Sequence, residues 1–253
     1  MPKSMIFFII FIILSIFFYF FILPSGKPLQ PPSLEYPLGT YLNGNNMINT
    51  NADAIVNTLI FGFIVGIIET TLALSFGYFS GISKRNIEIF MARVMDGVTA
   101  LPRIPLLLAI ALIYGTPTGN SLISNFFFVI LIVALTGWSN YARQVSKTIS
   151  ENKIITISKE LLPKFPFYLS LSLSSTSLKI FGKKIIIPAM VDGISTYTAM
   201  GVIAGVGDPS FPTLTTLLTT SSKLLPDWWL FLIPALLRAV LVVSLLYIAD
   251  KVK

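Results

Sequence analysis

The chain contains no cysteine and no histidine. Without cysteine it has neither a disulfide framework nor a thiol nucleophile, and without both residues it lacks the ligands of Cys/His metal clusters. The absence of histidine also removes the side chain that most often serves as a general base in enzymes. No G-x-x-x-x-G-K-[ST] phosphate-binding loop occurs in the sequence. We therefore predict that the chain is not an enzyme and binds no metal or cofactor of its own, ATP included.

Charge is also scarce, because only 11% of the residues are charged while 54% are hydrophobic. A soluble domain carries about 25% charged residues. Several apolar runs approach the ~20 residues that a helix needs to cross the hydrocarbon core of a bilayer. These features predict an all-α polytopic membrane protein in a lipid bilayer, forming a single transmembrane domain over residues 1–253. The formal net charge of +7 is therefore interpreted through membrane topology, and no nucleic-acid partner is expected.

Six apolar runs predict six transmembrane helices. Their expected bounds are about residues 5–23, 54–82, 87–114, 122–141, 185–206 and 228–249. The first run is longer than the ~7–15-residue apolar core of a signal peptide, and no small-residue cleavage site follows it. A retained first helix is therefore favoured over a signal peptide.

Lysine and arginine are distributed unevenly over the segments between these helices. Such residues are retained on the cytoplasmic side of the membrane. With a cytoplasmic N-terminus, the long loop at residues 142–184 holds eight of them, whereas the outer segments hold only Lys27 and Lys223. We therefore expect a plasma-membrane protein with both termini in the cytoplasm. Residues 24–53 and 210–227 are expected outside.

Five short segments lie at the ends of the predicted helices. They are Tyr36-Pro37-Leu38-Gly39-Thr40, Met91-Ala92-Arg93 with Asp96, Gly137-Trp138-Ser139-Asn140-Tyr141-Ala142-Arg143, Thr176-Ser177-Leu178-Lys179-Ile180-Phe181 with Lys184 to Pro188, and Gly205-Val206-Gly207-Asp208-Pro209-Ser210-Phe211-Pro212. In this order, and at these helix ends, they resemble the permease subunits of oligopeptide/dipeptide ABC importers. The resemblance extends from about residue 36 to the end and is closest to the second permease of the pair.

The resemblance implies a type I ABC importer permease fold and a transport function. The chain would pair with a second homologous permease and form with it the translocation pathway for peptides or short oligosaccharides. Two cytoplasmic ABC ATPase subunits would bind ATP and Mg²⁺, and an extracellular solute-binding protein would deliver the cargo. Which of these cargoes is carried cannot be read from the segments.

In this family the cytoplasmic loop carries a short coupling helix that contacts the ATPase. The corresponding segment here is Tyr168 to Phe181, although the Glu-Ala-Ala run and glycine of the family are replaced by a serine- and leucine-rich stretch. The resemblance implies coupling residues within it, namely Tyr168, Ser172, Ser175, Thr176, Ser177, Leu178 and Phe181. A loop that serves only topology is the alternative interpretation.

Two charged residues, Glu69 and Arg103, lie inside predicted helices. Charges at such depth are costly and usually face a cavity or a partner. They are candidates for the translocation pathway, and the alternative is an ion pair between helices that only fixes packing. Asp192 and Arg238 are open to the same two interpretations.

Two other functions remain open from the sequence. A secondary transporter would need internal repeats and an ion site at broken helices, and neither a repeat nor a histidine for proton relay is evident. A non-transporting membrane scaffold is compatible with the replaced Glu-Ala-Ala run.

Overall fold

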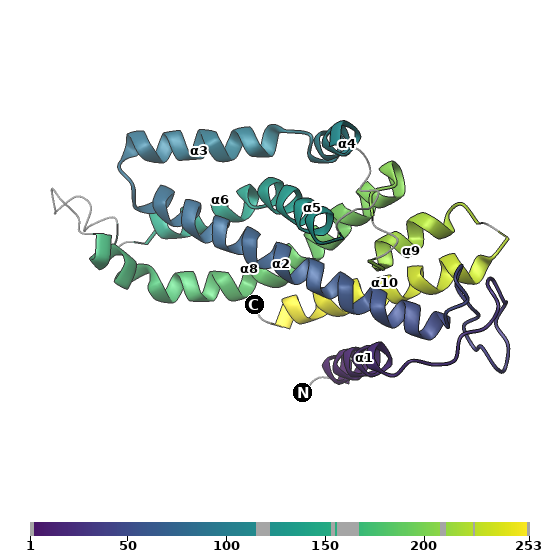
Figure 1. Cartoon of the computed structure of the whole chain (residues 1–253). Helices are drawn as coiled ribbons and strands as arrows, with labels where there is room; N and C mark the ends of the chain where they lie inside the picture. The colour runs from purple at the N-terminus through teal and green to yellow at the C-terminus, as the bar shows by residue number, and fades with distance from the viewer. Residues whose placement is uncertain are drawn as a thin grey trace.

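The computed structural model describes residues 3–114, 122–152, 155, 167–207, 211–224 and 226–251. In this part of the chain, helices are the only regular secondary structure besides one isolated bridge between Thr40 and Asn46. The all-α prediction is therefore confirmed there. The helices, labelled as in Figure 1, are α1 (Lys3–Phe20), α2 (Met47–Ile82), α3 (Arg85–Ala100), α4 (Arg103–Tyr114), α5 (Leu122–Gly137), α6 (Ser139–Ser150), α8 (Phe167–Ala204), α9 (Leu214–Ser221) and α10 (Trp228–Lys251).

Helix α2 is the centre of the bundle, and it packs against α8, α6, α1 and α5. Glycines permit the two closest approaches. A Cβ at Gly66 would lie 2.9 Å from the carbonyl oxygen of Ile186 in α8, and Gly62 faces the same helix. Gly77 and Gly81 abut α6 in the same way. Small residues four apart thus bring helix backbones together, as is common in membrane bundles.

Two helices are longer than a bilayer requires. Helix α2 has 36 residues and α8 has 38. At 1.5 Å per residue these helices measure about 54 and 57 Å, against a hydrocarbon core of about 30 Å. Both therefore extend beyond the lipid at one end or at both.

Several helices are long and apolar enough to span a membrane, as expected of a membrane protein. In the described residues these are Met47–Ile82, Ser172–Ile203 and Trp228–Lys251. The pair Phe126–Gly137 and Ser139–Ser150, bent by 42°, makes a fourth span if it is counted as one. The six predicted spans are thus matched only in part, and six remains a prediction.

The third predicted helix, residues 87–114, is broken into α3 and α4. Leu101 has extended backbone angles, φ −67° and ψ 128°. The cause is Pro102, because a proline ring disfavours helical backbone at the residue before it. The sequence predicts a kink at Pro102, and the structure shows a full break into two helices at this position.

The predicted cytoplasmic segment at residues 142–184, in which the resemblance implies a short coupling helix, is mostly helical over its described parts. Helix α6 covers its beginning, and α8 begins at Phe167 rather than near Ile185. Serine and lysine lower the hydropathy of residues 167–184, but Leu173, Leu178 and Phe181 pack in a cluster with residues of α6 and α2. Burial of that face, rather than propensity, stabilises the helix. Helix α2 likewise begins at Met47 instead of Ala54, while residues 153–154 and 156–166 lie outside the described part.

The two ends of the molecule differ in the segments they hold. Figure 1 shows residues 21–46, α9 and the start of α10 at the right end, and the α2–α3 connection with the start of α8 at the left end. At the right end, Gly39 adopts a left-handed φ of 77° and closes a turn in which its N–H donates to the Tyr36 carbonyl at 2.8 Å. A Cβ there would lie 2.9 Å from the Trp229 indole nitrogen. The glycine therefore allows this segment to pack on α10.

Candidate functional site

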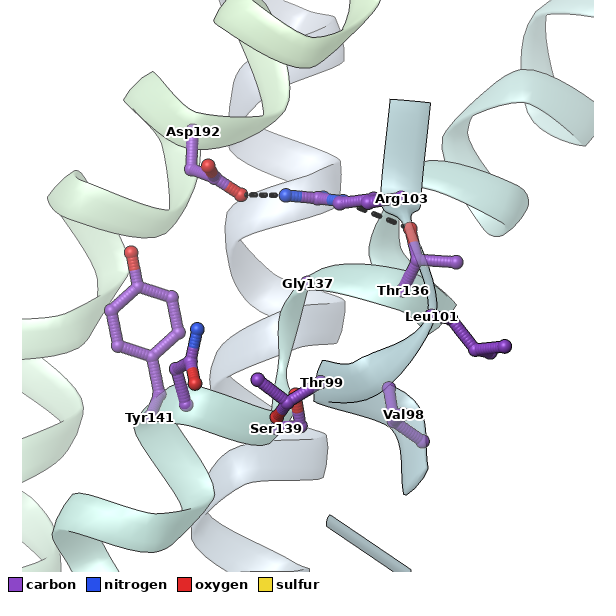
Figure 2. Close-up of a pocket in the computed structure, with 10 residues that line it drawn as sticks. Val98, Thr99, Leu101, Arg103, Thr136, Gly137, Ser139, Tyr141 and Asp192 are labelled. Carbon is purple, nitrogen blue, oxygen red and sulfur yellow. Dashed lines mark hydrogen bonds and ion pairs between the residues drawn. The ribbon is translucent and has the colours of Figure 1, made fainter. Parts of the chain in front are cut away.

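Three charged side chains meet inside the bundle, and we call them the charge triad: Glu69 of α2, Arg103 of α4 and Asp192 of α8. The Nη2 of Arg103 donates to Oε1 of Glu69 at 3.1 Å, and its Nη1 donates to Oδ2 of Asp192. The triad thus connects three helices that are distant in sequence. Figure 2 shows Asp192 and Arg103 pointing toward each other across the space between α8 and α4.

Arg103 is placed by the break between α3 and α4. It is the first residue of α4, whose first turn closes through a 3.0 Å hydrogen bond from the Leu106 N–H to the Pro102 carbonyl. Pro105 is tolerated in this turn because the N–H groups there have no partner within the helix. The partial positive charge of a helix N-terminus disfavours an arginine. Two carboxylates close to Arg103 offset this cost.

Helix α5 completes the surroundings of Arg103. Its Nε donates to the Thr136 hydroxyl at 3.0 Å, and its Nη2 donates also to the Val133 carbonyl at 2.9 Å. The hydroxyl of Thr136 in turn donates to backbone carbonyls of its own helix. The guanidinium is therefore held in a fixed plane by three helices, which is the geometry that arginine satisfies and lysine does not.

Burial is uneven across the triad. The side chain of Glu69 is 0% exposed, that of Arg103 is 22% exposed and that of Asp192 is 39% exposed. The second carboxylate oxygen of Glu69, Oε2, has no hydrogen-bond partner among the described residues. One end of the triad is therefore enclosed in protein while the other reaches an open space.

Gly137 makes room for the triad at the bend between α5 and α6. A Cβ at this position would overlap the Glu69 carboxylate and would lie 2.7 Å from Nη2 of Arg103. This glycine opens the segment Gly137 to Arg143, which carries part of the resemblance to peptide permeases. Its role here is steric, because only a residue without a side chain leaves space for both charged groups.

A cavity of about 240 Å³ lies beside the triad. Its polar lining includes Thr99, Arg103, Thr136, Ser139, Tyr141 and Asp192 (Figure 2). Tyr141 also lines a second cavity of about 490 Å³, together with Gln144, Lys184 and Asp250. The second cavity is lined mainly by apolar residues, among them Phe181, Ile185 and Leu246. The polar walls of the first cavity are able to hold water, so the side of the bundle beside the triad suits an aqueous space better than contact with lipid tails.

A second ion pair connects α3 and α6 near the first cavity. Arg143 Nη2 pairs with Asp96, and these side chains are 45% and 60% exposed. The hydroxyls of Thr99 and Ser139 lie 3.0 Å apart. Such an exposed pair contributes little to stability, about 0–1 kcal/mol, in contrast to the contact of Arg103 with the buried Glu69.

The structure brings together the two pathway candidates predicted from the sequence, Glu69 and Arg103. It adds Asp192, whose role the sequence left open, Thr136, which gave no signal, and Gly137, which the sequence singled out only as part of a resembling segment. An aspartate within an apolar run was the available signal for Asp192. No group of three or more His, Cys, Asp or Glu residues that suits a metal ion occurs within the described ranges.

The predicted coupling residues all belong to α8. Tyr168 lies in its first turn, and those from Ser172 onward lie on two faces of the helix. Ser172 and Thr176 are exposed, whereas Ser175 and Ser177 are half-buried. Leu178 and Phe181 pack with the core between α2, α6 and α8. Any contact with another subunit through this segment would therefore use Ser172 and Thr176 rather than Leu178.

No protein-family model matches the chain, and no curated protein matches it. The charge triad, the polar cavity beside it and the five short segments are therefore the basis on which a function is proposed.

Proposed function

We propose that the chain is a non-catalytic permease subunit of an ATP-driven ABC importer in the plasma membrane, with both termini cytoplasmic. It pairs with a second homologous permease, and the two form a pathway for peptides or short oligosaccharides. An extracellular solute-binding protein delivers the cargo, and two ATPase subunits bind ATP and Mg²⁺. The Glu69–Arg103–Asp192 triad borders the pathway, and the exposed face of α8 around Ser172 and Thr176 contacts an ATPase.

The continuity of α8 is the observation that carries this proposal. One helix, Phe167–Ala204, contains both the predicted coupling segment and Asp192 of the triad. The twenty residues from Ser172 to Asp192 correspond to about 30 Å along a helix. Alternating access needs movement at the ATPases to reach the membrane path through packed, rigid elements. Helix α8 offers such an element.

Glycines in three of the resembling segments add support. Gly39 forms the turn beneath Trp229, and Gly137 admits the triad. Gly205 ends α8 in a left-handed conformation with φ 67°, and its N–H donates to the Gly201 carbonyl at 2.8 Å. Such a glycine is a common helix stop. Each segment therefore has a local geometry that requires its glycine.

Reconstitution tests the proposal. The chain is purified together with the subunits that copurify with it, placed in vesicles and assayed for uptake of labelled peptides and oligosaccharides with and without ATP. We expect uptake only with ATP and loaded binding protein, and no ATP hydrolysis by the chain purified alone. Turnover by the single chain, free of contaminating ATPase, would overturn the non-catalytic role, and uptake without ATP would overturn the ABC mechanism.

A secondary transporter is the second candidate, and one observation favours it. The break between α3 and α4 places a charged residue beside two carboxylates within a bundle of membrane-length helices. Secondary transporters bind substrates and ions at such broken helices. In that case uptake would follow an ion or proton gradient, would be abolished by an ionophore, and would persist after ATP is depleted.

A further inference from the structure

The charge triad has two carboxylates and one guanidinium. Arg103 forms ion pairs with both carboxylates, those of Glu69 and Asp192. Tyr141 on α6 lines the same cavity as Asp192, and its phenol is neutral at physiological pH. With both carboxylates ionised, the cluster would carry one uncompensated negative charge inside a membrane bundle. Such a charge is costly unless it is paired or neutralised.

We propose that Glu69 is a proton-binding site: it is a neutral carboxylic acid in this arrangement, and Arg103 and Asp192 form the ion pair. The triad as a whole is then neutral. The proposal concerns the protonation of one side chain and holds for either transport mechanism considered above.

Three observations assign the proton to Glu69 rather than to Asp192. Glu69 is fully enclosed, whereas Asp192 borders the 240 Å³ cavity, where water solvates its charge. The 3.1 Å contact between Arg103 and Glu69 is longer than the ~2.7–2.9 Å typical of N⁺–H···O⁻ hydrogen bonds. Oε2 of Glu69 accepts no hydrogen bond from a described residue, although an ionised carboxylate has four lone-pair sites to satisfy.

The enclosure of the Glu69 carboxyl group also limits which cation can bind to it. The wall beside the Glu69 carboxylate is the backbone of Gly137, against which even one additional carbon would overlap. Glu69 does not line the cavity in which Asp192 and Arg103 take part. A hydrated metal ion or the ammonium group of a cargo has no room there, whereas a proton needs none.

The proton is coupled to the contact between α4 and α8. If Arg103 separates from Asp192, the carboxylate of Asp192 stays ionised in the water of the cavity. Arg103 then needs another anion, and Glu69 supplies it by losing its proton, which reaches solvent only when this opening lets water to the enclosed carboxyl group. Opening of the Arg103–Asp192 contact thus releases one proton, and closure takes one up.

Infrared spectroscopy of the full assembly in lipid nanodiscs tests this assignment. A protonated carboxyl group has a carbonyl stretch that is separate from the carboxylate bands and sensitive to deuterium exchange. At neutral pH we expect this band in the native chain, its shift when glutamate but not aspartate carries ¹³C, and its complete loss in Glu69→Gln. Exposed Glu35→Gln, the matched control, should keep the band.

The coupling predicts that Asp192→Asn also abolishes the band. Without the Asp192 carboxylate, the positive charge of Arg103 stabilises the ionised form of Glu69, which then loses its proton. A band that shifts with labelled aspartate, or is absent from the native chain, would overturn the assignment. A band that survives in Asp192→Asn would overturn the coupling. Gln has the shape of a neutral Glu and still accepts from Arg103, so failure of Glu69→Gln to assemble would show that an ionised Glu69 is required and would also overturn the proposal.

Discussion

Arg103 donates hydrogen bonds to four acceptors on three helices. Lysine at this position would keep the charge, but a single ammonium group does not span the same acceptors. We expect Arg103→Lys to reduce transport per assembled complex by roughly tenfold or more, since a hydrogen bond to a charged group is worth about 1.5–3 kcal/mol. Uptake normalised to the amount of assembled protein measures this.

The control for Arg103→Lys is Arg143→Lys, at the exposed pair with Asp96. This change should alter transport little. Normal uptake by Arg103→Lys would mean that the triad is a dispensable packing contact. A loss of assembly greater than the loss of transport would mean that Arg103 serves stability alone.

Gly137 and Gly97 make a matched pair of substitutions. Gly137→Ala would push a methyl group against Glu69 and Arg103, and overpacking of this kind costs about 1–3 kcal/mol. Gly97 lies within α3, where an added Cβ would meet no neighbouring atom within 4 Å, so Gly97→Ala should gain up to about 1 kcal/mol from helix propensity. The midpoint temperature of unfolding in detergent should therefore fall in Gly137→Ala and rise in Gly97→Ala. Equal shifts in the two variants would contradict the tight fit at Gly137.

The sequence predicts the charged members of the triad unequally. Glu69 and Arg103 were recognisable because each interrupts an apolar run. Asp192 also interrupts an apolar run, but the sequence does not show that it faces Arg103. That contact depends on how α8 is rotated about its axis, which the packing of α8 on Gly62 and Gly66 of α2 decides. Thr136 and Gly137 are ordinary in a membrane helix, and their roles follow only from what lies opposite.

Helix α8 has an exposed face and a packed face at its beginning. Thr176 is exposed and Leu178 is packed with the α2–α6 core. We expect Thr176→Trp to leave insertion and assembly intact and to abolish the stimulation of ATPase activity by loaded binding protein. Reconstituted complexes provide the measurement, and Thr148→Trp on the exposed face of α6 is the control for bulk.

Equal behaviour of Thr176→Trp and Thr148→Trp would remove this face of α8 from the coupling contact. Leu178→Asp is not suitable as a test of coupling, because it would place a carboxylate against the apolar cluster on which the half-buried Leu178 packs and would destabilise the subunit as well. The structure thereby changes the expectation that both Ser177 and Leu178 face a partner.

The bounds of a helix were predictable where the hydropathy of the sequence alone decides where it begins and ends. Helix α10 agrees with its predicted bounds to within two residues, because a long apolar run between Trp228 and Lys251 has no competing interpretation. A short helix at Tyr168 to Phe181 was implied by the resemblance, but its continuity with the rest of α8 was not predicted, because the stability of this half comes from one buried face within a polar composition. Pro102 predicts a kink in the third helix from the sequence, but not that the helix ends there, so residues 87–114 were given as one helix.

At the scale of the whole molecule, the positions of the loops predict membrane topology. Ser33 and Ser222 are exposed in segments near one end, and Thr148 is exposed on α6 toward the other (Figure 1). The chain has no cysteine, so single cysteines are labelled without background. We expect an impermeant thiol reagent to label Cys placed at Ser33 or Ser222 only from outside, and at Thr148 only from inside. The reverse pattern would invert the topology.

The close approach of α2 and α8 at Gly66 and Ile186 has a mechanical consequence. Pro188, which removes one helical hydrogen bond, lies at the same level, so this contact is a natural fulcrum for α8. A tilt of about 10° around it would carry Ser172 by about 4 Å but Asp192, on the short arm, by only about 1.5 Å in the opposite direction. That shorter travel still exceeds the tolerance of a hydrogen bond. If α8 pivots there, this ratio sets how far its first turns have to move before the contact between Arg103 and Asp192 opens.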